Sequence, residues 1–280
     1  MTDSTAHLMN RISSQLTGRP GLVALDGGRR PAPPALVVVA HGSRDPRALS
    51  TVRTLLDRVR ALRPGLPVHL GHIELNEPLL TDTLADLDAH GTTDAVLVPL
   101  LLARGYHVKR DIPEMAAAAR VRTRVAAPLG PHPLLVDTLY ARLVEAGWNP
   151  RMTDAERRSS AVVLAAAGSR DPDSATDTAR TAQLLSERLG VPVVPAYAST
   201  AKPTVPTAIR ALTARGRTRV AIASYFTAPG RFATECASQA PWIASAPLGT
   251  HPAMARLLLH RYDQSLAAPV SMTAPELASA

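Results

Sequence analysis

A repeated segment constrains the fold of this sequence more than any other feature. The letters GSRDP occur at residues 42–46 and again at 168–172, and APLG occurs at 127–130 and again at 246–249. Each APLG is followed, one residue further on, by a His-Pro pair. Spaced matches in the same order indicate an internal duplication. Because 280 residues suffice for two domains that each bury a core, we predict two similar lobes that face one another across a cleft.

Within each half, short apolar runs alternate with segments of helical period, which is typical of βα units that build a mostly parallel sheet. In the first half we expect strands at 35–40, 68–74, 94–100 and 124–127, and helices at 47–62, 78–89, 112–120 and 132–146. Aromatic residues make up only 3% of the chain, so Ala, Val and Leu must fill the cores. The predicted fold class is α/β, with two tandem flavodoxin-like or Rossmann-like lobes and parallel sheets.

Domain limits follow from the same pattern. Residues 1–34 mix Ser, Thr, Gly, Arg and Pro without a sustained period, which predicts a flexible leader. The helix at 132–146 is expected to complete the first lobe. The predicted limits are 35–147 for the first lobe, 148–159 for a linker, 160–264 for the second lobe and 265–280 for a tail.

Charge and cysteine content narrow the function classes. The net charge of +8, carried mostly by Arg, indicates an anionic partner. The Arg residues are dispersed and aromatic residues are scarce, which argues against nucleic acid. The single cysteine, Cys236, excludes an intrachain disulfide and a cysteine-based metal site within one chain. It predicts a reducing, cytoplasmic setting, and no apolar run approaches the length of a membrane span.

Three residues at predicted strand ends could carry chemistry. His41 follows the first strand, Glu74 closes the second, and His107 lies in the loop after the third. Because open parallel sheets bind ligands beyond the carboxyl ends of their strands, the three side chains can share one rim. Two imidazoles and a carboxylate suit a divalent ion such as Fe²⁺, Co²⁺, Ni²⁺ or Zn²⁺. Spacing alone also fits a backbone-bonded His41, a Glu74 paired with an Arg and a solvated His107.

The second half provides an internal comparison for these candidates. The aligned pairs, with Pro78 matched to Pro203, are His41 with Ala167, Glu74 with Ser199, and His107 with Phe232. All three candidate ligands are therefore replaced in the second half, although GSRDP is kept. This joint difference favours a metal site that only the first half carries.

Basic residues near the candidate site could hold an anionic substrate. The GSRDP loop at 42–46 resembles an anion-holding loop at the start of a helix, although Asp before Pro is also an ordinary helix start. It has neither a Walker lysine nor a GxGxxG run, which argues against nucleotide binding. The candidates for binding substrate carboxylates are Ser43, Arg44, Arg104 and Lys109, with solvated charge as the alternative.

Three further histidines receive supporting roles. His72 lies on the same face of the predicted strand as Glu74 and is a candidate hydrogen-bond partner for the site. His132 and His251 each precede Pro at the start of a predicted helix, which favours a role in starting that helix over a chemical one.

Three motifs together resemble a known family. They are AHGSRDP after the first strand, IELNEP at the end of the second and PLLLARGYHVKRDIP after the third. This combination is similar to the CbiX/SirB family of sirohydrochlorin chelatases, which are class II tetrapyrrole chelatases, and the resemblance spans about residues 35–262. It implies the class II chelatase fold and insertion of Fe²⁺ or Co²⁺ into sirohydrochlorin, in siroheme or cobalamin biosynthesis, without an organic cofactor.

The same resemblance implies roles for individual residues. His41, Glu74 and His107 match the family's metal-binding positions, where the histidines deliver the metal and accept pyrrole protons. Because the second half lacks all three, we expect one active site per chain and a second lobe that forms the opposite wall of the cleft. Basic residues of that lobe are expected to touch substrate carboxylates, and the candidates are Arg170, Lys202 and Arg231.

Two matters stay open at this stage. A non-catalytic carrier of metal or tetrapyrrole could use the same residues, and iron is only slightly favoured over cobalt because both accept imidazole and carboxylate ligands. Since one chain supplies both lobes, we predict a monomer.

Overall fold

A computed structural model describes residues 33–268. The leader predicted at 1–34 lies almost entirely outside the described residues, as does most of the tail predicted at 265–280. Helices within the described part are all too short or too polar to cross a lipid bilayer.

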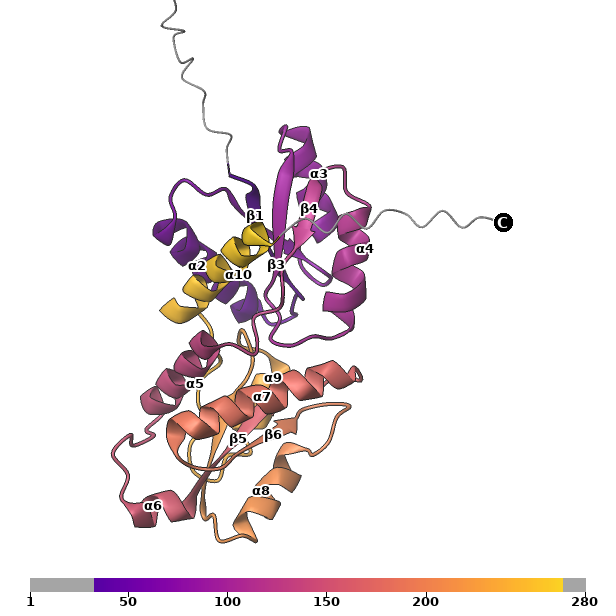
Figure 1. Cartoon of the computed structure of the whole chain (residues 1–280). Coiled ribbons are helices and arrows are strands. Elements are labelled where there is room, and N and C mark those ends of the chain that lie inside the picture. Colours follow the sequence, from indigo (N-terminus) through magenta and orange to yellow (C-terminus); the bar gives the residue numbers. More distant parts are fainter. Residues whose placement is uncertain (1–32, 269–280) are drawn as a thin grey trace, which may run out of the picture. The chain divides into compact units, whose positions relative to one another are not determined.

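Two parallel sheets confirm the α/β class and the duplication (Figure 1). The first sheet has the order β2-β1-β3-β4 and the second has the order β6-β5-β7. The two central strands, β1 and β5, are buried at every position, which is why both appear in the sequence as unbroken apolar runs. The strands are β1 (Ala35–Ala40), β2 (Val68–His72), β3 (Asp94–Pro99), β4 (Arg122–Val125), β5 (Ser160–Ala166), β6 (Val193–Tyr197) and β7 (Arg219–Ser224).

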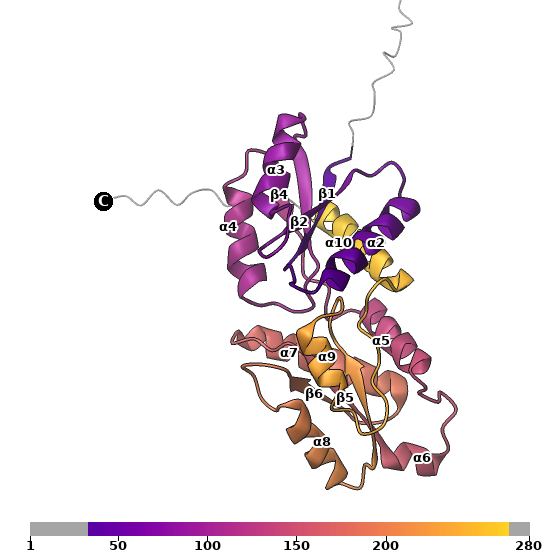
Figure 2. The same cartoon turned by 180° about the vertical axis from the view of Figure 1, so that it is seen from behind.

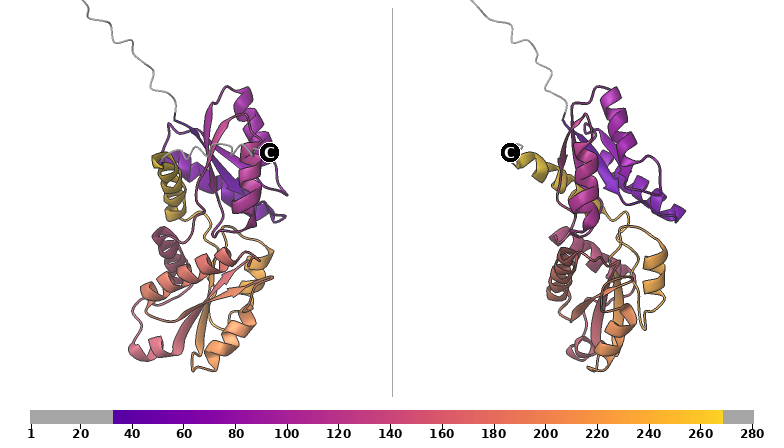
Figure 3. Two further views of the ribbon diagram at one scale, coloured as in Figure 1. Left: turned by 45° about the vertical axis from the view of Figure 1, so that its right-hand side comes forward. Right: turned by 90° about the vertical axis from the view of Figure 1, so that its right-hand side faces the viewer.

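Helices cover both faces of each sheet (Figure 3). In the first half they are α2 (Pro46–Leu62), α3 (Leu80–Ala89), the π-helix η1 (His107–Asp111), α4 (Ile112–Ala117), α5 (Pro133–Glu145) and α6 (Asp154–Ser159). In the second half they are α7 (Pro172–Leu189), α8 (Val205–Thr213), α9 (Arg231–Ala237) and α10 (Pro252–Ala267). The helix α6 lies inside the predicted linker at 148–159.

Both GSRDP segments start a helix. In each of them, the Asp side chain accepts the N–H two residues further on and Pro occupies the first helical turn, so Asp45 starts α2 and Asp171 starts α7. Each segment therefore leads from a buried central strand into the following helix.

The last helix of each half packs on the other half of the chain. Helix α5 contacts α7 and β7, whereas α10 contacts α2 and β3. Figures 1 and 2 show α10 beside α2 from opposite sides. Hydrogen bonds secure the crossing, because the Tyr262 hydroxyl donates to the Pro34 carbonyl at 2.7 Å and Arg63 binds both carboxylate oxygens of Asp263. The helix predicted at 132–146 therefore does not complete the first lobe, because periodicity defines an apolar face and not the sheet that receives it.

One apolar core joins the two lobes. It runs from the α2 and α10 side of the first sheet, through α5, to the α7 side of the second sheet, and includes Leu36, Leu139, Leu164 and Leu258. Two smaller clusters lie under α3 and α4 on the first sheet and under α8 on the second. The lobes thus share buried side chains, and the loops after β1, β2 and β3 stand on a packed support.

Candidate metal centre

The backbone beyond β2 holds Glu74 next to His41. Strand β2 ends at His72, earlier than the predicted limit of 74, but the Glu74 N–H still donates to the His41 carbonyl at 3.0 Å. The two side chains meet there, with His41 Nε2 lying 3.6 Å from Glu74 Oε1. The first two candidate residues are therefore brought together by main-chain pairing.

A strained turn fixes this contact further. Leu75 has a φ of 68°, and the Asn76 N–H donates to the Glu74 carbonyl at 2.8 Å, so residues 74–76 form a γ-turn with positive φ, a rare conformation. The turn places the Glu74 carbonyl against Gly42, where a Cβ would lie 1.8 Å from the oxygen. The Asn76 side chain also accepts the Ser43 N–H at 2.7 Å. The loops after β1 and β2 are thus joined through their backbones.

His107 reaches the same rim from the first turn of η1. The Ile112 N–H donates to the His107 carbonyl, a π-type bond that spans five residues and is frequent at functional sites. The His107 ring stands edge-on to the His41 ring, with centroids 4.7 Å apart. The predicted loop after the third strand is therefore helical from His107 onward, and α4 ends at Ala117, before the predicted limit of 120.

Hydrogen bonds define which nitrogen each imidazole presents. His107 Nδ1 is hydrogen-bonded to the Asp111 carboxylate, and His41 Nδ1 lies 3.3 Å from the Gly42 carbonyl. Both partners can only accept, so Nδ1 carries the proton in each neutral ring and Nε2 keeps its lone pair. A carboxylate that orients a ligand histidine in this way is a recurrent support of metal sites.

The three side chains are accessible. The side-chain exposures are 41% for His41, 55% for Glu74 and 38% for His107. Within residues 33–268, no three His, Cys, Asp or Glu side chains are grouped so that they enclose a metal ion. The structure brings the predicted residues together on an open rim, and their role as metal ligands remains a prediction.

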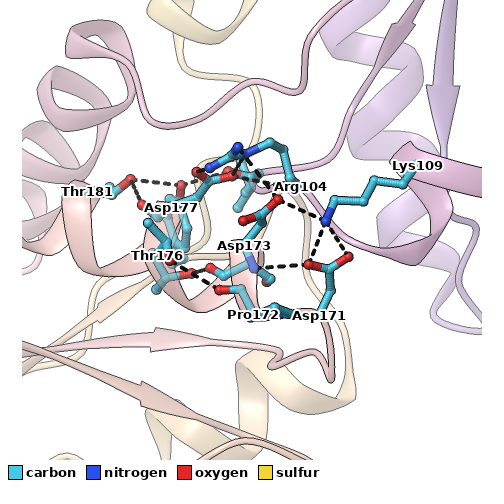
Figure 4. A network of polar contacts seen from close by, with 12 residues as sticks. Arg104, Lys109, Asp171, Pro172, Asp173, Thr176, Asp177 and Thr181 are labelled. Carbon is cyan, nitrogen blue, oxygen red and sulfur yellow. Dashed lines mark hydrogen bonds and ion pairs between the residues drawn. The ribbon is translucent and has the colours of Figure 1, made fainter.

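The residues predicted to bind substrate carboxylates fall into two groups. Arg44 is exposed and forms no ion pair with any described residue, while Arg231 lies over the Phe232 ring and 3.7 Å from Glu235. Ser43 supports its own loop, because its hydroxyl accepts the Asp45 N–H at 3.1 Å. Arg104 and Lys109 are instead paired with carboxylates of α7 (Figure 4). Their predicted contact with substrate is untested.

The remaining predictions about histidines have different outcomes. His132 and His251 start α5 and α10 as predicted, because Nδ1 of each accepts a backbone N–H of the first turn. His72 does not support Glu74. It is buried and its Nδ1 lies 3.1 Å from the Pro78 carbonyl, and burial lowers its pKa. The chain leaves the strand conformation after His72, so the alternation that would place His72 and Glu74 on one face does not reach Glu74. The expected contact between them is therefore absent.

The second lobe repeats the backbone of the rim without its chemistry. The Ser199 N–H donates to the Ala167 carbonyl at 3.0 Å, as Glu74 does to His41. The bond from Lys109 N–H to the Gly105 carbonyl recurs between residues 234 and 230. These equivalent bonds confirm the alignment of the two halves. They also place Phe232 at the position of His107 and the buried Cys236 at the position of Asp111.

Sequence reasoning missed several residues of the rim. Asn76 lies inside the IELNEP motif, and Asp111 follows His107 by four residues, a spacing that places two side chains on one helical face. Both could have been inferred from position. Asp177 could not, because nothing in the sequence of α7 indicates that one of its acids faces the His107 loop.

The described fold agrees with comparisons to known proteins. Sirohydrochlorin ferrochelatase of Bacillus subtilis (strain 168) is 31% identical over 176 residues, which cover 60% of this chain and 64% of that protein, just under two thirds of its length. Sirohydrochlorin cobaltochelatase of Priestia megaterium is 25% identical over 259 residues, covering 85% of this chain and 82% of that protein. The structure of SirB from Bacillus subtilis with Fe³⁺ superposes with a TM-score of 0.67 at 25% identity, over 83% of this chain and 95% of SirB.

A family model gives the broadest match. The CbiX model aligns with residues 35–146 and again with residues 161–265, so it covers both halves of the duplication. These two ranges include the rim formed by His41, Glu74 and His107 as well as its altered copy. This chain therefore belongs to the CbiX family.

Proposed function

We propose that this protein is a sirohydrochlorin chelatase that inserts Fe²⁺ or Co²⁺ into the tetrapyrrole. The observation that carries the proposal is the convergence of His41, Glu74 and His107 on one open rim, with Nδ1 of each imidazole beside an acceptor oxygen, which leaves Nε2 to face the rim. Relatives named as a ferrochelatase and a cobaltochelatase, and a related structure with Fe³⁺, support this chemistry.

The reaction exchanges two protons for one metal ion. Two pyrrole N–H bonds break, the divalent ion takes their place among the four ring nitrogens, and two protons are released, so charge is balanced. A neutral imidazole can bind the ion through Nε2 and, after the ion has moved, accept a proton at the same atom near pH 7. Glu74 lies close enough to His41 to offset the metal charge. The metal is a substrate, so the proposed reaction needs no organic cofactor.

Exposure and charge fit a large anionic substrate. The three ligand side chains are between 38% and 55% exposed, so a planar ring can approach them. Arg44 lies three residues after His41 with its guanidinium unpaired within residues 33–268. We assign it to a substrate carboxylate, with Ser43 and Arg231 as further candidates. A cytoplasmic, monomeric protein without nucleic-acid or membrane partners remains the expectation.

Turnover tests the proposal. Purified protein is mixed with excess sirohydrochlorin and Fe²⁺ or Co²⁺ under anaerobic conditions, and the absorption spectrum of the tetrapyrrole is followed. A chelatase converts many equivalents faster than the protein-free mixture does. A spectral change that stops at one equivalent would instead identify a carrier of metal or tetrapyrrole. Rates at matched free concentrations of the two metals then establish which one the protein prefers, and we expect iron.

A further inference from the structure

The segment that carries His107 is tied to the second lobe on both sides of this residue. Three residues before it, Arg104 binds Asp177 of α7, and two residues after it, Lys109 binds Asp171 and Asp173 (Figure 4). We refer to Arg104, Lys109, Asp171, Asp173 and Asp177 as the inter-lobe network. Because both anchors belong to α7, the position of His107 depends on the half of the chain that lacks the candidate ligands.

Asp177 is the centre of this network. Its side chain is only 4% exposed, and its oxygens accept the Arg104 main-chain N–H at 2.8 Å, Nε at 3.0 Å and one terminal nitrogen at 2.7 Å. The main-chain bond fixes the loop itself and not only the Arg side chain. Charge-assisted bonds of this kind are stronger and more directional than neutral ones. Asp177 therefore sets where the loop leaves β3 and enters η1.

Tyr225 supports the start of the same loop. Its buried hydroxyl donates to the Leu102 carbonyl at 3.0 Å and lies 3.2 Å from Thr181 Oγ1 on α7. Burial raises the pKa of this phenol, so it stays a donor at neutral pH. The carbonyl of residue 102 and the N–H of residue 104 are thus both fixed by the second lobe.

The duplicated crossing on the other side lacks these ion pairs between the lobes, and Asp45, the counterpart of Asp171, pairs with Arg47 of its own lobe. Gly105 lies near Ser169, and Gly230 lies near Ser43. The loop after β3 therefore lies against the GSRDP segment of the second lobe, and the loop after β7 lies against that of the first. At the second crossing the equivalent positions carry no such pairs. By the aligned bonds, Arg104 corresponds to Pro229 and Lys109 to Thr234, while Asp173 and Asp177 correspond to Arg47 and Thr51. General packing between lobes does not require the network, since one crossing forms without it.

From this asymmetry we infer that Asp177, acting through Arg104, is a positioning residue that holds the His107 imidazole at the metal rim. The inference deepens the proposed function and rests on it. Lys109 with Asp171 and Asp173 fixes the far side of the same short segment. The second lobe, whose own rim has lost its ligands, thereby contributes to the geometry of the first.

A double-variant comparison tests the inference with Co²⁺ alone. The visible spectrum of Co²⁺ added to the full-length protein reports the dissociation constant and the ligand field. We expect Asp177→Asn and Arg104→Ala each to weaken Co²⁺ binding by roughly tenfold, as loss of a support behind a ligand does, and Arg104→Lys to restore part of the loss. In a His107→Ala background, Asp177→Asn should have no further effect, because the network acts through that ring.

The matched control is another Arg–Asp pair between distant parts of the chain. Arg63 binds Asp263 with two bonds of 2.6 and 2.8 Å, away from the rim. Asp263→Asn should leave the Co²⁺ dissociation constant within about twofold of the unaltered protein, because it removes a pair outside the network. Thermal unfolding of every variant checks folding, and Arg104→Ala, at a side chain 46% exposed, keeps the test valid if Asp177→Asn does not fold.

Turnover provides a second readout. With sirohydrochlorin as substrate, Asp177→Asn should lower kcat and leave KM nearly unchanged, because the Asp177 side chain is buried and its oxygens are taken by Arg104. Equal losses of Co²⁺ affinity from Asp177→Asn with and without His107 would overturn the inference, as would no loss in a folded variant. If His107→Ala itself leaves Co²⁺ binding unchanged, the proposed metal site fails, and the inference fails with it.

Discussion

The loop after β1 and the loop after β5 share a sequence, a helix start and a backbone partner, yet only the first stands beside a candidate metal centre. In both, the carbonyl of the residue before the glycine accepts the N–H of a residue just beyond the next strand, namely Glu74 for His41 and Ser199 for Ala167. The difference lies in a few side chains and one turn. A duplicated framework can therefore be retained for packing while its chemistry is kept in one copy.

The largest expected effect contrasts the ligands with their replaced counterparts. His41→Ala or His107→Ala should reduce metal insertion at least about 100-fold, because each removes a lone pair that, in the proposed function, binds the ion and accepts a proton. Ala167→Ser, the matched change in the second lobe, should leave the rate nearly unaltered. Steady-state rates with circular dichroism as a folding control decide the matter. Unaltered rates in both histidine variants would contradict the proposed metal site.

The two glycines of the GSRDP segments should respond unequally. Gly42→Ala places a Cβ 1.8 Å from the Glu74 carbonyl, whereas the nearest atom to a Cβ on Gly168 is 3.3 Å away. Both residues have positive φ, so each substitution has a conformational cost, but only the first adds a backbone clash. Urea unfolding should show that the free energy of unfolding falls by roughly 3 kcal/mol for Gly42→Ala and by about 1 kcal/mol for Gly168→Ala. Equal losses of unfolding free energy would show that the γ-turn adjusts to the added Cβ at little cost.

The residues behind the two rims give a third contrast. Asp111→Asn should lower kcat about tenfold, because an amide no longer stabilises the imidazole that carries charge during transfer. Cys236 occupies the equivalent position and is buried. Cys236→Ala should leave kcat intact, whatever it does to stability. Should both variants turn over like the unaltered protein, Asp111 has only a structural role.

The smallest effect concerns the histidines that start α5 and α10. Burial, with Arg261 and His260 nearby, lowers the pKa of His132 to about 4, and burial lowers the pKa of His251 as well. The folded state then binds fewer protons than the unfolded state below the ordinary value of 6.5. The contribution of these histidines to the free energy of unfolding is complete above about pH 6.5 and is lost progressively as the pH falls toward 4.

A non-titrating cap tests this pH dependence. Asn at position 132 keeps a side-chain acceptor for the helix and cannot take up a proton. His132→Asn should therefore lose less stability than the unaltered protein between pH 7 and about 5, measured as the urea midpoint. His251→Asn should flatten the same curve less. Parallel curves for all three proteins would show that neither histidine controls the acid response.

The sequence predicted the parts of this fold that local patterns control. Central strands, the Asp-Pro helix starts and the order of the units follow from runs and periods that depend on near neighbours. The convergence of His41, Glu74 and His107 followed from strand-end placement. The positive φ of Leu75 could not be predicted, because packing against Gly42 imposes a conformation that Leu does not favour. The partner of Arg104 was equally hidden, because a charge 73 residues away has no local signature.

The exchange of α5 and α10 has a consequence for synthesis. A ribosome adds roughly 5–20 residues per second and delivers the chain from its N-terminus. His41, Glu74 and His107 have all been synthesised once η1 has emerged. Helix α10, which packs on β3, follows only with residues 252–267. A nascent first lobe therefore has an exposed apolar face until residues 252–267 have been made. The first lobe is fully covered only when α10 is present, and a product that stalls before α10 should be a substrate for proteolysis.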